Sequence, residues 1–180
     1  MVVPKLILLH GFAGIGKTTI AERYMNERPL TMLLEAERVG AMLGQWLKYE
    51  VEARELLYKL SQPMTATYLK AGHNVIIPML STNLKHIQSF ERIGREVDAQ
   101  FFEVVLVAER AEAIRRLLQR GKWGEEDADP ITEADLPAIE ELYDDMQKTL
   151  TGRTDAVRIP SVEGDHDGTY RKFLAAIGEA

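Results

Sequence analysis

Cysteine is absent from this chain of 180 residues, and its absence removes several kinds of chemistry at once. Disulfide bonds, zinc sites built from thiolates and a cysteine nucleophile are all excluded. Long apolar runs are also missing, so no segment reaches the length needed to cross a bilayer. The N-terminus has no basic region followed by a long apolar stretch, which argues against a signal peptide. We therefore expect a cytoplasmic protein without a membrane segment.

An excess of positive charge is missing as well. The chain has 22 lysine and arginine residues against 28 aspartate and glutamate residues, which gives a formal net charge of −6. Such a chain has no general electrostatic attraction for nucleic acid or for an anionic membrane, so we expect neither partner. Linkers and low-complexity stretches are not found, and the hydrophobic fraction of 46% is ordinary for a globular protein. We predict a single domain over residues 1–180 and leave the oligomeric state open.

What the chain does contain is a complete glycine-rich motif. Residues 11–19 fit the pattern G-x-x-x-x-G-K-[ST] and directly follow the apolar run Leu6–Leu9. Such a loop turns backbone N–H groups inward around an anion, and a helix over residues 18–27 would aim its positive end at the same place. An ordinary strand-to-helix turn is the alternative, but motif, strand and helix together favour nucleotide binding. The predicted nucleotide-binding residues are Gly11, Phe12, Ala13, Gly14, Ile15, Gly16, Lys17, Thr18 and Thr19.

The polar residues of this motif have separate tasks. Lys17 would place an ammonium group against the β- and γ-phosphates, and the Thr18 hydroxyl would complete the shell of a Mg²⁺ ion. Thr19 would bind the α-phosphate or occupy the first helical turn. The motif therefore predicts a nucleotide held together with magnesium.

Apolar segments of strand length alternate with amphipathic helical segments along the whole chain. Parallel strands covered by helices are buried on both faces, and the strand candidates have that character. Right-handed βα units then predict a three-layer α/β/α sandwich with a five-stranded parallel sheet and ligands above the carboxyl ends of the strands. The predicted strands are Leu6–Leu9, Leu30–Leu34, Val75–Ile77, Phe101–Val107 and Ala156–Ile159, and helical spacing is found over 39–47, 84–97, 114–118, 136–146 and 170–177.

Two carboxylates and a guanidinium follow the second predicted strand. Glu35, Glu37 and Arg38 would lie at the sheet edge that faces the glycine-rich loop. A carboxylate there could hold a metal-bound water or accept the proton of an attacking hydroxyl. Alternatively, both glutamates merely favour the positive end of the next helix. Arg38 would bind an anionic substrate or remain solvated, and Trp46 would line an acceptor pocket or belong to the core.

A second basic element precedes a glycine-bracketed segment. Arg116 and Arg120 are four residues apart, so both could point from one helix face toward one phosphate. Gly121 and Gly124 then bracket a segment that could close over the site, and we predict a lid-like region near residues 116–131. Solvated arginines near the end of a helix are the alternative.

Taken together, these motifs resemble the kinase-like group of P-loop proteins, and more narrowly chloramphenicol phosphotransferase, zeta-toxin kinases and related AAA-labelled predicted kinases. The resemblance covers nearly the whole chain and implies a P-loop NTPase fold of the nucleotide kinase type with ATP as donor. It implies that Glu35 or Glu37 acts on the acceptor hydroxyl and that Arg116 and Arg120 hold the transferring phosphates. It also implies that the segment 161–165 lies near the base and that residues 38–70 recognise the acceptor.

The chain departs from this family pattern in two places. Many relatives have aspartate after the second strand, whereas this chain has glutamate at both positions. The third strand, over residues 74–79, lacks the acidic residue that often ends such a strand. The carboxylate contact to the metal must then come from elsewhere, and we assign the metal to Thr18 and Glu37, with Glu35 as the other candidate.

The sequence thus predicts a Mg²⁺-dependent phosphotransferase that moves the γ-phosphate of ATP to a hydroxyl of a small molecule. Its predicted catalytic residues are Lys17, Glu35, Glu37, Arg116 and Arg120, and the predicted substrate residues are Arg38 and Trp46. An ATP-binding regulatory protein or NTPase without phosphotransfer, and a kinase of polynucleotide ends, are the alternatives.

Overall fold

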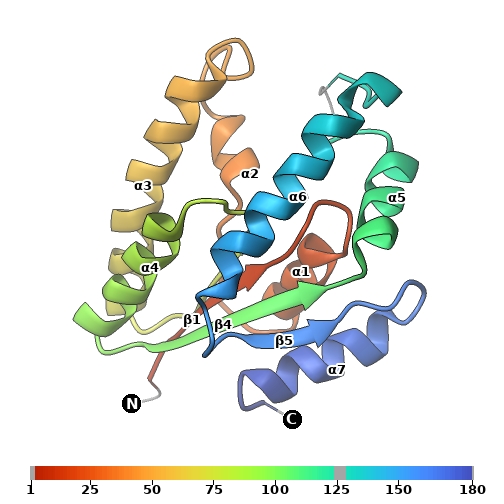
Figure 1. Ribbon diagram of the computed structural model, residues 1–180. Coiled ribbons are helices and arrows are strands. Elements are labelled where there is room, and N and C mark those ends of the chain that lie inside the picture. The colour runs from red at the N-terminus through yellow and green to blue at the C-terminus, as the bar shows by residue number, and fades with distance from the viewer. Residues whose placement is uncertain (1–2, 124–128, 180) are drawn as a thin grey trace.

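A parallel sheet lies between two layers of helices (Figure 1). The computed structural model describes residues 3–123 and 129–179, apart from the side chains of residues 36 and 37. The elements in chain order are β1 (Lys5–His10), α1 (Lys17–Glu27), β2 (Met32–Leu33), α2 (Ala36–Gly40), α3 (Glu50–Lys70), β3 (Val75–Met79), α4 (Leu84–Glu96), β4 (Gln100–Val107), α5 (Arg110–Arg120), the 3₁₀ turn Glu133–Asp135, α6 (Leu136–Thr151), β5 (Val157–Pro160) and α7 (His166–Ala176).

The sheet has the strand order β2-β3-β1-β4-β5, and every neighbouring pair is parallel. Helices α1 and α7 cover one face, where Tyr24 packs edge-on against Phe173 with ring centroids 5.5 Å apart. Helices α3, α4 and α6 cover the other face (Figure 1). The five-stranded parallel sheet and the three-layer arrangement predicted from the sequence are therefore confirmed.

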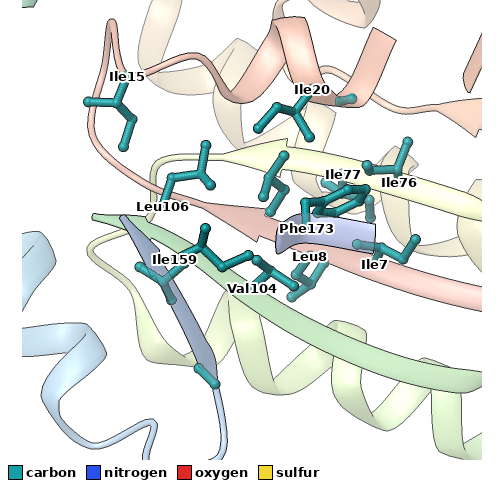
Figure 2. Packing of buried hydrophobic residues seen from close by; sticks show 14 of the residues in the cluster. Ile7, Leu8, Ile15, Ile20, Ile76, Ile77, Val104, Leu106, Ile159 and Phe173 are labelled. Atoms are coloured by element: carbon teal, nitrogen blue, oxygen red, sulfur yellow. The ribbon is translucent and has the colours of Figure 1, made fainter. Parts of the chain in front are cut away.

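The core lies where these layers meet the central strands. Strand β1 is flanked by strands on both sides and covered on both faces, so its residues Leu6–Leu9 have no solvent exposure. Figure 2 shows how side chains from β1, β3 and β4 pack with Ile20 of α1 and Phe173 of α7. Burial of this apolar surface holds β1 rigidly, and β1 carries the glycine-rich loop at its carboxyl end.

The edges of the sheet differ from the prediction. The strand predicted over 30–34 forms only at Met32–Leu33, because Leu30 follows Pro29 and adopts a left-handed conformation with φ 58°. Burial on both faces is also wrong for β5, where Val157 and Arg158 are exposed. An edge strand has a neighbour on one side only, so less of its surface is covered.

The helix predicted over 39–47 is also shorter than expected. Helix α2 ends at Gly40, and the chain continues through turns in which Gln45 has φ 57°. Met42 is 82% exposed, so the apolar spacing of this segment does not face the core. The substrate region predicted near 38–70 is thus mostly α3 with a short arm before it. In the described ranges 3–123 and 129–179 no helix has the length and apolar character needed to cross a membrane.

One buried hydroxyl in α3 has a measurable cost. Thr65 is completely buried, and its hydroxyl finds no hydrogen-bond partner within the described part of the chain. We expect Thr65→Val to raise the free energy of unfolding by about 1 kcal/mol, because it keeps the shape and removes an unsatisfied polar group. Urea denaturation would measure this gain, with the exposed Thr67→Val as control. A loss of stability in Thr65→Val alone would show that the hydroxyl is satisfied in solution.

Candidate active site

The glycine-rich loop joins the centre of the sheet to α1. Gly14 and Gly16 have φ values of 79° and 95°, a region that side chains disfavour, so the loop needs glycine at both positions. Side chains at Gly14 are excluded a second time, because a Cβ there would lie 3.2 Å from the backbone nitrogen of Leu117 in α5. The loop is therefore packed between β1 and α5, with its amides and the start of α1 at the carboxyl edge of the sheet.

An aromatic pair holds this loop against α6. Phe12 is 1% exposed, and its ring meets that of Tyr143 in α6 edge-on, with centroids 5.2 Å apart. The Tyr143 hydroxyl in turn donates to the carbonyl oxygen of Ala108 over 3.0 Å.

The Lys17 Nζ donates to the Phe12 carbonyl oxygen over 2.7 Å. The ammonium group is thus held over the loop, where an incoming phosphate would meet it.

A carboxylate meets the loop from the next strand. Thr18 Oγ1 donates to Glu35 Oε1 over 2.8 Å, although the two residues are far apart in sequence. Glu35 is buried, and its other oxygen lies 2.6 Å from Nε of Arg38. Arg38 also pairs with Glu22 of α1. The structure thus brings together Thr18, Glu35 and Arg38 at the carboxyl edge of β2 and the start of α1.

The Thr18 and Glu35 oxygens suit magnesium. Two ligands at right angles on an octahedral Mg²⁺, each about 2.05 Å from the ion, lie about 2.9 Å apart. The 2.8 Å between the Thr18 and Glu35 oxygens is close to this spacing, and both are the hard oxygen donors that Mg²⁺ prefers. The carboxylate assigned from sequence was that of Glu37, which belongs to α2, but its side chain lies outside the described residues. Glu35 is therefore the carboxylate that the structure places beside Thr18.

The remaining substrate residue, Trp46, lies in the arm before α3. Its half-buried ring packs over Gly40, where a Cβ would come within 3.2 Å of it. This contact joins the turns after α2 to the helix itself. A role for Trp46 in acceptor binding stays a prediction.

Helix α5 approaches the loop from the opposite side. Arg116 donates through Nη1 and Nη2 to the side-chain and carbonyl oxygens of Ser161, each over 3.2 Å. Ser161 Oγ donates to the Ile15 carbonyl oxygen over 2.8 Å. Glu112 aligns the guanidinium by accepting from Arg116 Nε over 2.8 Å. The segment after β5, the glycine-rich loop and α5 are therefore linked through Arg116 and Ser161.

A pocket lies at this junction. It has a volume of about 280 Å³ and is lined by residues that include Gly16, Thr19, Arg116, Gln119 and Ser161. A larger hollow of about 540 Å³ on α5 contains Arg110 and Arg115 but no residue of the loop. Of these two, the smaller pocket is lined by Gly14, Ile15 and Gly16 of the loop, and we take it as the candidate nucleotide pocket.

The two predicted lid arginines point to different partners. Arg120 donates to the carbonyl oxygens of Lys122 and Trp123, beyond the end of α5, whereas Arg116 faces the pocket. Of the lid-like region near 116–131, residues 124–128 lie outside the described ranges. A role for Arg120 in phosphate binding stays a prediction.

Several residues around the site were not identified from the sequence. Glu112 accepts from both Arg115 and Arg116, and these hydrogen bonds lower its pKa to about 2, so it stays charged. The sequence feature that could have identified Glu112 is its spacing of four residues from Arg116.

Glu103 is buried next to His10. The sequence feature that could have identified Glu103 is that it is the single acidic residue in the apolar strand segment 101–107.

The fold and the loop define the class of this protein: it has the architecture of P-loop kinases, with the phosphate-binding loop after the central strand. Residues 6–146 match the family described as AAA domain. The chain therefore belongs to this family. No curated protein matches the sequence.

Solved structures show the same fold at low sequence identity. A gluconokinase from Sinorhizobium meliloti 1021 has a TM-score of 0.65 at 13% identity and covers 99% of this chain and 94% of its own. The tunicamycin resistance protein of Deinococcus radiodurans has a TM-score of 0.61 at 15% identity, covering 98% and 97%. A chain of the Pnkp1/Rnl/Hen1 RNA repair complex has a TM-score of 0.67 at 21% identity, covering 92% of this chain but 51% of its own.

Proposed function

We propose that this protein is a Mg²⁺-dependent phosphotransferase that moves the γ-phosphate of ATP to a hydroxyl of a small molecule. The observation that carries the proposal is the hydrogen bond between Thr18 and Glu35. It places a carboxylate beside the hydroxyl that follows the loop lysine, as transfer from a metal-bound triphosphate requires.

The loop and α5 would bind the donor. The amides of residues 11–16 would surround the β-phosphate, and the start of α1 would add its positive end. The Lys17 ammonium, which donates to the Phe12 carbonyl oxygen, would turn to the β- and γ-phosphates. The pocket between Arg116 and Ser161 takes the nucleoside, with Thr19 near the α-phosphate.

Glu35 would act at the transferring phosphate. A bound Mg²⁺ ion would neutralise charge on the phosphate oxygens, and Thr18 and Glu35 would hold it with its waters. Glu35 has one oxygen on Thr18 and one on Arg38, so its orientation is fixed before substrate arrives. Glu35 or Glu37 would accept the proton of the acceptor hydroxyl while its oxygen bonds to the γ-phosphorus and ADP leaves. Arg116 stabilises the charge that develops on the phosphates.

The acceptor would enter beside α2 and α3. This side of the site follows Glu35 directly in the chain and includes Arg38 and Trp46. The gluconokinase that shares the fold is named for a small hydroxylated acceptor, which supports a substrate of that kind. The structural similarity to a chain of an RNA repair complex makes a polynucleotide end the second acceptor to test.

Transfer of label from ATP tests the proposal directly. Protein, Mg²⁺ and γ-labelled ATP are incubated with a panel of sugars, polyols, nucleosides, aminoglycosides and a 5′-hydroxyl oligonucleotide. We expect a labelled small molecule that does not form when EDTA replaces Mg²⁺. Labelled inorganic phosphate alone would identify an NTPase, and a labelled oligonucleotide would identify a polynucleotide-end kinase. A protein that shows no heat with Mg–ATP or Mg–GTP in calorimetry would overturn nucleotide binding itself.

A further inference from the structure

A buried polar group directly precedes the phosphate loop and has no role in the mechanism above. His10 is the last residue of β1, and its side chain is 1% exposed. Within the described ranges neither of its ring nitrogens has a hydrogen-bond partner. Glu103 Oε1, from the neighbouring strand β4, lies 3.6 Å from His10 Nε2 and also lacks a partner among these residues. Buried polar atoms without partners are rare, so a cluster of them next to a functional loop needs an explanation.

The second oxygen of Glu103 is firmly held. Arg153, which follows α6, donates to Glu103 Oε2 through Nε over 2.9 Å and through Nη2 over 2.6 Å. The same Nη2 donates to Glu91 of α4 over 2.8 Å. Glu103 therefore has one oxygen committed to Arg153 and one directed at His10. The array connects the end of β1 to α4 and to the segment that follows α6.

The protonation state of His10 decides what it can do with this carboxylate. Burial, together with the charges of Lys17 and Arg153, lowers the pKa of His10 to about 3, so the ring is neutral at ordinary pH. A neutral imidazole has one N–H donor and one acceptor nitrogen. Glu103 Oε1 can only accept, so the proton belongs on Nε2, which faces it, and a closing movement of about 0.6 Å brings the pair to ordinary hydrogen-bond distance.

We propose that His10 is a positioning residue of the phosphate loop: its Nε2–H donates to Glu103, and Glu103 and Arg153 thereby fix the backbone from which the loop starts. The role in nucleotide binding rests on the function proposed above, whereas the position of the proton does not. The backbone at this junction is tightly packed, since a Cβ at Gly11 would lie 2.9 Å from the carbonyl oxygen of Leu106. A small rotation of the backbone at His10 would therefore shift Gly11 and, with it, the amides of the loop.

Glu103→Gln tests the proton position because it reverses one donor and one acceptor. Arg153 has only donors, so the amide oxygen of the new side chain must face it, and the amide NH₂ then faces His10 Nε2. His10 is forced to accept at Nε2 and to carry its proton on Nδ1. Glu91→Gln is the matched control, because it alters a partner of Arg153 without touching the carboxylate that faces His10.

The measurement is the ¹⁵N spectrum of the imidazole rings in the full-length protein between pH 5 and 8. His10→Gln identifies the His10 signals by their loss. We expect the Nε2–H tautomer without titration in the native protein and in Glu91→Gln, and the Nδ1–H tautomer in Glu103→Gln. An Nδ1–H tautomer in the native protein, a midpoint within this pH range, or an unchanged tautomer in folded Glu103→Gln would each overturn the proposal.

Calorimetry with Mg–ATP tests the effect on the loop. We expect affinity about fivefold weaker in His10→Leu, the effect of one lost hydrogen bond, whereas Glu103→Gln keeps a hydrogen bond of reversed direction and should retain native affinity. His10→Gln keeps an N–H donor toward Glu103 and should retain native affinity, as should Glu91→Gln. Equal losses in His10→Leu and His10→Gln would overturn the positioning role. Absence of heat with native protein would instead overturn the proposed function and leave the tautomer result intact.

Discussion

Lys17→Met should abolish phosphoryl transfer, with a fall in kcat/KM of about a thousandfold or more. Methionine keeps the length and much of the apolar stem but removes the ammonium that the structure holds 2.7 Å from the Phe12 carbonyl oxygen. In the native protein this ammonium would stabilise the negative charge on the β- and γ-phosphates during transfer. Initial rates with γ-labelled ATP, measured over a range of ATP concentrations, would separate the loss in kcat from the loss in binding.

The control for this variant is Lys70→Met. Lys70 is the exposed last residue of α3, and the chain then enters β3 at its amino end, away from the carboxyl ends of the strands where the loop lies. Lys70→Met removes the same charge as Lys17→Met. It should leave kcat/KM within about twofold of the native value, since exposed and distant charges are screened by salt. If Lys17→Met retained more than a tenth of the native rate while Lys70→Met was unaffected, the loop would not take part in phosphoryl transfer.

Glu35→Gln should lower kcat by about a hundredfold or more while metal-free ATP binds with nearly native affinity. Glutamine can still accept the hydrogen bond from Thr18 through its amide oxygen, so the loop keeps its contact. It lacks the charge that would hold magnesium and the basicity that would remove a proton. The concentration of Mg²⁺ that gives half of the maximal rate should therefore rise, and steady-state rates over a magnesium titration would measure it.

Glu22→Gln separates this effect from the loss of an ion pair. Glu22 also binds Arg38, but it lies on the surface of α1 and is not hydrogen-bonded to Thr18. It should keep kcat and the magnesium requirement within about twofold, as expected for an exposed ion pair. Equal kcat values in Glu35→Gln and Glu22→Gln would exclude Glu35 from the chemical step and leave Glu37 as the acidic residue to vary next.

Much of the fold followed from local sequence patterns. The run Leu6–Leu9 is apolar at every position, which is typical of a strand buried on both faces, and it forms the central strand of a parallel sheet. The spacing of Ile87, Phe90 and Ile93 is helical, and these residues form the buried face of α4. The apolar spacing gave a wrong prediction where no other element packs against the segment, as in the exposed arm around Met42.

The candidate site divides in the same way. The sequence alone identified the phosphate loop and the start of α1, because the glycines that permit positive φ and the first turn of the helix are neighbours in the chain. Tertiary structure alone decided that Glu35 meets Thr18, that Arg116 rather than Arg120 faces the pocket, and that Glu103 lies beside His10. These contacts join residues distant in the chain, and their side-chain directions depend on how helices and strands pack, which no local pattern specifies.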